Sequence, residues 1–200
     1  MMVRPSPVEA YVAVGSNLEP EKHIKQALAR LLQSVRVTAV STFYRTEHVP
    51  SQAESAPGPR ATGAGQPVAG PSRPRNQPAY LNGVWRVETD KSARVLKFEV
   101  LRRIEAELGR TRSADKYAPR TIDLDLVLYG DNAINEEGMR IPDSEIRCRP
   151  FLAVPLLEIA SSLRLPDSGE DLSSLSVAHM TNDLEPLPEF TEDLRGLISR

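Results

Sequence analysis

Cysteine is almost missing from this chain of 200 residues. The single one, Cys148, excludes an intramolecular disulfide and a metal site built from several cysteines. No apolar run approaches the length of a membrane span, and residues 1–10 lack the apolar core of a secretory signal peptide. We therefore expect a cytoplasmic protein that does not associate with membranes.

Strong net charge and several well-known catalytic motifs are also missing. The net charge is −2 and the isoelectric point is near 6.0, so nothing in the overall charge indicates a nucleic-acid partner. There is no Gly-x-x-x-x-Gly-Lys-Ser/Thr loop, no protein-kinase signature set and no Gly-x-Ser-x-Gly elbow. A P-loop kinase is therefore excluded by pattern. The content of 40% hydrophobic and 26% charged residues is that of a globular protein. The sequence identifies no protein partner.

Hydrophobic periodicity predicts an alternating order of strands and helices. Helix spacing of apolar residues predicts a helix that starts near Pro20 and another over residues 95–108, which Gly109 ends. Strands are expected over residues 10–14, 35–44, 80–89 and 122–128. The order β-α-β-β-α-β predicts an α+β, ferredoxin-like core, a mainly antiparallel sheet with helices packed on it. Apolar residues 150–159 predict a further helix after Pro155.

Composition sets two segments apart from this core. Residues 47–79 hold seven of the 17 prolines and four of the 11 glycines, with few residues that could be buried. We expect a disordered insertion there, because so little apolar surface cannot offset the entropy of ordering the chain. Residues 1–178 are predicted to form a single domain around this insertion. Residues 179–200 form an acidic tail with one short amphipathic helix around Phe190 and Leu194.

Two carboxylates share one face of the strand over residues 122–128. Asp123 and Asp125 are two residues apart, hence roughly 6.5–7 Å apart along a strand, while Ile122, Leu124, Leu126 and Leu128 occupy the other face. A basic loop, residues 109–120, leads into this strand with Arg110, Arg112, Lys116 and Arg120 against a single acid. A solvated strand beside a solvated loop is the simpler interpretation of each part alone. Their combination predicts a magnesium–phosphate site, since Mg²⁺ bridges phosphate oxygens while arginines neutralise the remaining charge.

Three further polar residues have two possible interpretations. Glu105 lies on the second predicted helix, where a solvated helix face is the simpler explanation. Tyr80 and Asn82 share one face of their strand. That face either lines a polar pocket or is exposed to water.

Several short motifs extend through the predicted core. They occupy residues 11–18, 41–46, 80–82, 104–105, 108–110, 119–126 and 149–160. With them the chain resembles the 6-hydroxymethyl-7,8-dihydropterin pyrophosphokinases of folate biosynthesis, over about residues 10–46 and 80–177. The resemblance implies transfer of pyrophosphate from ATP to the hydroxymethyl group of the pterin, with release of AMP.

The resemblance also assigns roles to individual residues. It implies that Asp123 and Asp125 hold two Mg²⁺ ions, which bridge the phosphates of the co-substrate ATP. Arg110 and Arg120 match positions that stabilise charge as the β-phosphorus is attacked. The positions that match ATP-binding residues are Glu105, Arg112 and Arg149. Those that match the pterin pocket are Gly15, Thr46, Tyr80, Asn82, Tyr117 and Phe151.

Departures from the family pattern remain, and two rival functions stay open. Tyr117 stands where relatives often carry Trp, and Asp143 stands where the family usually carries His near the ATP phosphates. No general base is evident. The rivals are another Mg²⁺-dependent nucleotidyl or phosphoryl transferase, and a ferredoxin-like binding module without catalytic activity.

Overall fold

A central antiparallel sheet organises the protein, for which we obtained a computed structural model. The structure describes residues 6–46, 78–110 and 119–199. The predicted insertion at 47–79 lies almost wholly outside these ranges, as do Arg112 and Tyr117. The strands of the main sheet are β1 (Val8–Ser16), β2 (Arg36–Val40), β3 (Tyr44–Thr46), β4 (Tyr80–Thr89), β5 (Asp123–Tyr129) and β8 (Glu185–Pro186).

The strand order confirms the predicted ferredoxin-like core. The sheet runs β5-β1-β4-β3-β8, β2 also pairs with β4, and every one of these described pairs is antiparallel. Strand β4 covers the residues predicted for it. A small hairpin, β6 (Ile134–Glu136) with β7 (Met139–Ile141), follows β5.

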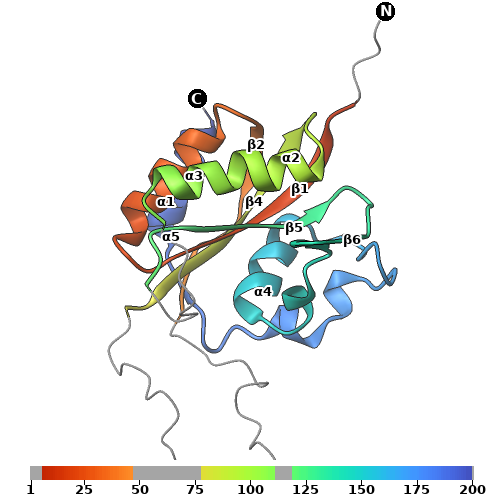
Figure 1. Cartoon of the computed structure of the whole chain (residues 1–200). Coiled ribbons are helices and arrows are strands. Elements are labelled where there is room, and N and C mark those ends of the chain that lie inside the picture. Colours follow the sequence, from red (N-terminus) through yellow and green to blue (C-terminus); the bar gives the residue numbers. More distant parts are fainter. Residues whose placement is uncertain (1–5, 47–77, 111–118, 200) are drawn as a thin grey trace, which may run out of the picture.

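Helices cover both faces of the sheet (Figure 1). One face carries α1 (Pro20–Leu31), a long helix in three parts and α5 (Pro188–Ile198). The three parts are α2 (Ala93–Val95), the π-helical turn η2 (Leu96–Leu101) and α3 (Arg102–Glu107). The other face carries α4 (Pro150–Ile159), with the short helical turns η3 (Ser144–Arg147), η4 (Leu172–Ser174) and η5 (Ser176–His179) nearby. Among the described residues, no helix combines the length and apolar character needed to cross a membrane.

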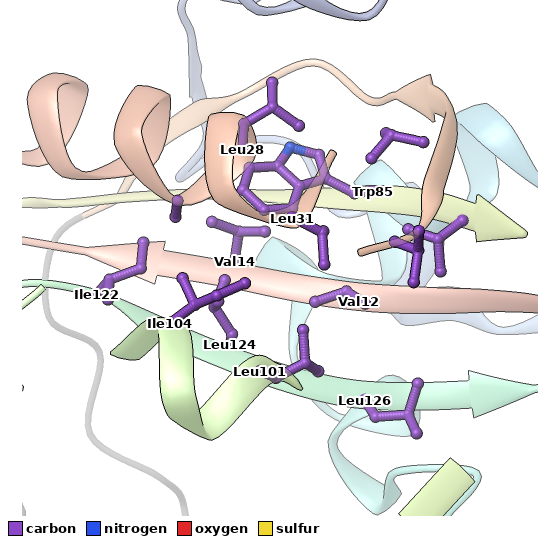
Figure 2. Packing of buried hydrophobic residues seen from close by; sticks show 14 of the residues in the cluster. Val12, Val14, Leu28, Leu31, Trp85, Leu101, Ile104, Ile122, Leu124 and Leu126 are labelled. Carbon is purple, nitrogen blue, oxygen red and sulfur yellow. The ribbon is translucent and has the colours of Figure 1, made fainter. Parts of the chain in front are cut away.

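The two predicted helices form with their expected ends. Pro20 occupies the first turn of α1, where its missing N–H costs no hydrogen bond. Gly109 follows the second helix with a φ of 78°, the left-handed conformation that glycine adopts without strain. Both helices pack their apolar stripes on the sheet, and Figure 2 shows Leu101 and Ile104 directed at Leu124 and Leu126.

The strand predicted over residues 35–44 is broken in two. Between β2 and β3 the regular ladder with β4 is interrupted, and side chains accept backbone N–H groups from both β4 and the intervening segment. The Ser41 hydroxyl accepts the N–H of Val84 at 2.8 Å, and the Thr191 hydroxyl of α5 accepts the N–H of Phe43 at 2.9 Å. Tertiary contacts therefore end a pattern that alternation alone would continue.

Strand β5 contains a bulge that the alternation does not reveal. Tyr11 pairs with Leu128 but Val12 pairs with Leu126, so Val127 is an extra residue. Leu128 therefore packs with Val127 in the cluster under α4, and its predicted place beside Leu124 is wrong.

The helix expected after Pro155 begins earlier. Helix α4 starts at Pro150, and Pro155 lies buried inside it. Proline is tolerated at the first helical position, so Pro150 is the better start signal of the two.

The C-terminal segment packs against the same core. Phe190 and Leu194 of α5 are buried in the cluster that contains α1 and the sheet. The Phe190 ring meets Phe43 edge-on at 5.5 Å between centroids. The predicted amphipathic helix is therefore present, and it covers β2.

Candidate active site

One cavity of about 510 Å³ opens on the α4 side of the sheet. Residues of β1, β3, β4 and β5 form its floor, and residues 143–152 form one wall. Nine of the predicted site residues line it: Gly15, Thr46, Tyr80, Asn82, Arg120, Asp123, Asp125, Arg149 and Phe151. The roles predicted for Arg112 and Tyr117 fall outside the described residues.

A row of residues across three strands sets the geometry of the cavity floor. Gly15 of β1 pairs with Asn82 on one side and with Asp123 on the other. A Cβ atom on Gly15 would lie 3.0 Å from Oδ1 of Asn82 and 3.9 Å from Cβ of Asp123. Because glycine has no side chain, the space on the cavity floor between the Asn82 amide and the Asp123 carboxylate stays unfilled.

Asp123 is held by two arginines. Arg110 and Arg120 each donate from Nη1 to a different oxygen of its carboxylate. Arg110 also donates to Glu105. Burial of Arg110 opposes its charge, but Asp123 and Glu105 outweigh that effect and raise the pKa of Arg110. Arg110, which does not itself contribute to the cavity lining described above, thus reaches the site through Asp123.

Glu105 is buried, which corrects the simpler interpretation of a solvated helix face. Only 3% of its surface is exposed, and its Oε1 accepts the N–H of Leu124 at 2.8 Å as well as Arg110. It thereby ties α3 to β5 behind Asp123. Its contact with ATP stays a prediction.

Asp125 has a different environment from Asp123. About half of its side chain is exposed, and Lys97 Nζ lies 3.9 Å from its Oδ1. Burial of the carboxylate raises the pKa of Asp125 to about 7, and the negative charge of Asp123 adds to the rise. Because part of the side chain reaches water, solvent screens some of this effect.

The pair of carboxylates suits Mg²⁺ bound together with a nucleotide. Within the described ranges, no three His, Cys, Asp or Glu side chains converge as a ready-made metal site. Mg²⁺ does not need one, since it keeps several waters and binds through one or two carboxylates and substrate phosphates. Burial and the neighbouring charge of Asp123 both raise the pKa of Asp125, and a bound cation would favour its ionised form.

The cavity wall formed by residues 143–149 carries both signs of charge. Asp143 lines the cavity and accepts the N–H of Glu145 at 2.8 Å, which starts the short turn η3. Burial raises the pKa of Glu145 and the charge of Asp143 adds to this, whereas Arg149 opposes it. Asp143 is therefore anchored by its own turn and faces the cavity as an acid.

The remaining wall suits a flat ligand with a hydrogen-bonding edge. Asn82 Nδ2 donates to Thr46 Oγ1 at 2.6 Å, which leaves the amide oriented in the cavity. Tyr80 and Phe151 add aromatic surface, and the Arg149 guanidinium lies 5.8 Å from the Phe151 ring centroid. The polar-pocket interpretation of Tyr80 and Asn82 is therefore the one that the structure supports.

Ser16 and Asn17 hold the segment that carries Arg120. Asn17 Oδ1 accepts the N–H of Arg120 at 2.7 Å, and Ser16 Oγ donates to the carbonyl of Thr121 at 2.5 Å. In the sequence these residues belong to the motif over residues 11–18, without an assigned contact. Ser and Asn side chains commonly bond to backbone groups, which was the available signal, but their partner lies more than 100 residues away.

Known proteins were compared with the chain. A family profile described as 7,8-dihydro-6-hydroxymethylpterin-pyrophosphokinase (HPPK) matches residues 62–161. A 2-amino-4-hydroxy-6-hydroxymethyldihydropteridine pyrophosphokinase from Haemophilus influenzae is 36% identical over 80% of this chain and 87% of that protein. The protein of the same name from Pseudomonas aeruginosa is 33% identical over 89% and 96%, respectively.

A solved structure supports the fold. The crystal structure of a Plasmodium falciparum HPPK-DHPS triple mutant with pteroate aligns with a TM-score of 0.60 at 11% identity. The match covers 88% of this chain and 44% of that longer one. Identity over most of both chains to the two bacterial relatives is what decides the family. The chain belongs to the 7,8-dihydro-6-hydroxymethylpterin-pyrophosphokinase family.

Proposed function

We propose that this protein transfers pyrophosphate from ATP to 6-hydroxymethyl-7,8-dihydropterin, giving the pterin diphosphate and AMP in folate biosynthesis. The observation that carries the proposal is one cavity in which paired carboxylates and arginines adjoin a flat pocket with an amide and two aromatic rings. Family membership supports the same reaction.

The reaction needs an acceptor oxygen, a phosphorus and a leaving group in line. The hydroxymethyl oxygen attacks the β-phosphorus and loses its proton, and the bond between that phosphorus and the α,β-bridging oxygen breaks. AMP leaves with the bridging oxygen. Holding both substrates in this alignment supplies a large part of the rate enhancement in such a transfer.

Asp123 and Asp125 are the proposed anchors for two Mg²⁺ ions. When bound, the ions would neutralise phosphate charge and ease deprotonation of the acceptor hydroxyl. Arg110 and Arg120 hold Asp123 in the metal-free protein. In our proposal they turn to the phosphate oxygens when ATP binds, where planar guanidinium groups match phosphate geometry.

The opposite end of the cavity is the proposed pterin pocket. Asn82, held by Thr46, would hydrogen-bond to the polar edge of the ring, and Phe151 and Tyr80 would contact its faces. Gly15 would allow the ring to lie close to the cavity floor. Arg149 is the proposed contact to ATP between the two ends.

The test is an assay with ATP, Mg²⁺ and 6-hydroxymethyl-7,8-dihydropterin in which AMP, ADP and pyrophosphate are resolved. We expect AMP that depends on the pterin and disappears when EDTA is added. ADP as the product would indicate an ordinary kinase, and pyrophosphate a nucleotidyltransferase. No turnover by the folded protein would favour a binding module.

A further inference from the structure

Lys97 is a largely buried lysine that none of the roles above uses. It lies in the π-helical turn η2, and only 14% of its side-chain surface is exposed. The turn is widened because the N–H of Arg102 donates to the carbonyl of Lys97, five residues earlier. Lysine normally keeps its ammonium in water, and π-turns occur often at functional sites. We therefore expect the buried ammonium of Lys97 to lie near a group of opposite charge.

That partner is a carboxylate of the proposed metal site. Turn η2 packs on β5, and Figure 2 shows Leu101, one helical turn after Lys97, against that strand. The Nζ of Lys97 lies 3.9 Å from Oδ1 of Asp125. Among the described residues, Asp125 is the ion-pair partner of Lys97.

The pair is loose, and its surroundings are acidic. A charge-assisted N–H···O bond is typically about 2.7–2.9 Å long, so 3.9 Å is an ion pair without a tight hydrogen bond. The charges of Asp123, Glu105 and Asp143 all disfavour the ionised form of Asp125, whereas that of Lys97 favours it. Lys97 thus supplies Asp125 with the counter-charge that two arginines supply to Asp123.

We propose that Lys97 holds Asp125 in the metal-free protein and turns to the phosphate oxygens of the nucleotide once a divalent cation binds Asp125. This inference rests on the proposed function. A divalent cation repels the ammonium and replaces its charge. Ligands of one Mg²⁺ lie at about 2.1 Å from it, so a phosphate oxygen on the same ion comes within about 3 Å of the Asp125 oxygen. A compact ammonium on a flexible stem can make that exchange without movement of the helix.

Two binding measurements test the exchange without relying on turnover. Lys97→Met keeps the apolar stem and removes the charge. We expect it to bind Mn²⁺ alone, followed by the electron paramagnetic resonance of free Mn²⁺, about threefold more tightly, because a weak competing ion pair is gone. We expect it to bind the Mg²⁺ complex of α,β-methylene ATP, measured by calorimetry, about tenfold more weakly, because a charged contact to phosphate is lost. Lys97→Arg should keep both affinities within about threefold of wild type.

If Lys97 only stabilised the fold, its substitution would not change the affinities for Mn²⁺ and for the nucleotide complex in opposite directions. Unchanged affinities in Lys97→Met, or a loss of both, would overturn the proposal. Lys97→Gln, which keeps a polar tip, is measured in parallel and should show the same opposite shifts if Lys97→Met does not fold. Lys22→Met, at an exposed lysine paired with Glu19, is the matched control and should change neither value. If the wild type binds metal and nucleotide but forms no pterin-dependent AMP, the proposed function fails while the exchange is still measured.

Discussion

The two faces of strand β5 have different surroundings, one in the apolar core and one in the candidate active site. Leu124 and Leu126 point into the dry cluster between the sheet and the helices α1 and α3, where almost none of their surface is exposed. Asp123 and Asp125, which alternate with them, point into a cavity lined by charged and polar groups. Because strand side chains alternate, adjacent residues serve stability on one face and chemistry on the other. Substitutions should therefore separate the two properties.

The largest expected effect is on the chemical face. Asp123→Asn removes the charge that Arg110 and Arg120 share and one of the two proposed Mg²⁺ anchors. We expect kcat/KM for pterin-dependent AMP formation to fall about 1,000-fold, the scale seen when preorganised charge is removed from an active site. Asp193→Asn, at an exposed acid paired with Lys25, is the control and should remain active. An active Asp123→Asn variant would contradict the assignment.

The next largest effect is a loss of stability from a substitution on the apolar core face of β5. Leu126→Ala leaves a cavity in the core cluster between the sheet and the helices, and we expect the free energy of unfolding to fall by about 2–5 kcal/mol. Urea unfolding measures this change. At a temperature where the variant is folded, kcat should stay within about threefold of wild type, since no cavity residue is altered. Met180→Ala, at an exposed side chain, should change stability little. Loss of activity in a fully folded Leu126→Ala variant would show that the two faces of β5 do not serve separate roles.

A smaller effect is expected at Gly15 on the cavity floor. Gly15→Ala places a Cβ 3.0 Å from Oδ1 of Asn82, so the amide that Thr46 holds must move by a few tenths of an ångström. The pterin KM should rise about tenfold, a change of about 1.4 kcal/mol. The KM for ATP should change less if Gly15 contacts the pterin, as we propose. Equal increases in both constants would argue against that placement.

The smallest effect concerns pH. Burial raises the pKa of Asp125 to about 7 in the metal-free protein, so between about pH 4 and pH 7 the folded state binds more protons than the unfolded state. Stability contributed by this group is present at low pH and is lost as the pH rises through that window. Because Asp125 is half exposed, we expect a loss of only about 1 kcal/mol.

Asp125→Asn isolates this contribution. We measure the free energy of unfolding of wild type and variant at pH 5 and at pH 8. Only the wild type should lose about 1 kcal/mol between these pH values through this group. Saturating Mg²⁺ should reduce the loss at pH 8, because the cation compensates the ionised carboxylate. A difference that does not vary with pH would show that Asp125 titrates as an ordinary surface acid.

Much of this division could be predicted from local pattern. The alternation that separates Asp123 and Asp125 from Leu124 and Leu126 is a property of neighbouring residues, as is the proline that starts α1. These features depend on backbone geometry within a few residues, so they survive in the folded protein. The prediction for Leu128 failed because a bulge adds one residue, and a shift of one residue moves every later side chain to the opposite face.

What could not be predicted depends on contacts between distant parts of the chain. The burial of Glu105 needs Arg110 and the backbone of Leu124 as partners, and the pairing of Lys97 with Asp125 needs a π-turn packed on β5. The link from Asn17 to Arg120 spans 103 positions. Periodicity describes which face a residue occupies, but not which charge another element brings to that face.

The sequence by itself determined the order of the elements, the paired acids and the family motifs, because these are encoded by residue type and local spacing. Only the tertiary structure decided how the charges are matched, with two arginines on Asp123 and one loosely held lysine on Asp125. The physical reason is that the energy of a charge in a cavity depends on every group within a few ångströms, whatever its position in the chain.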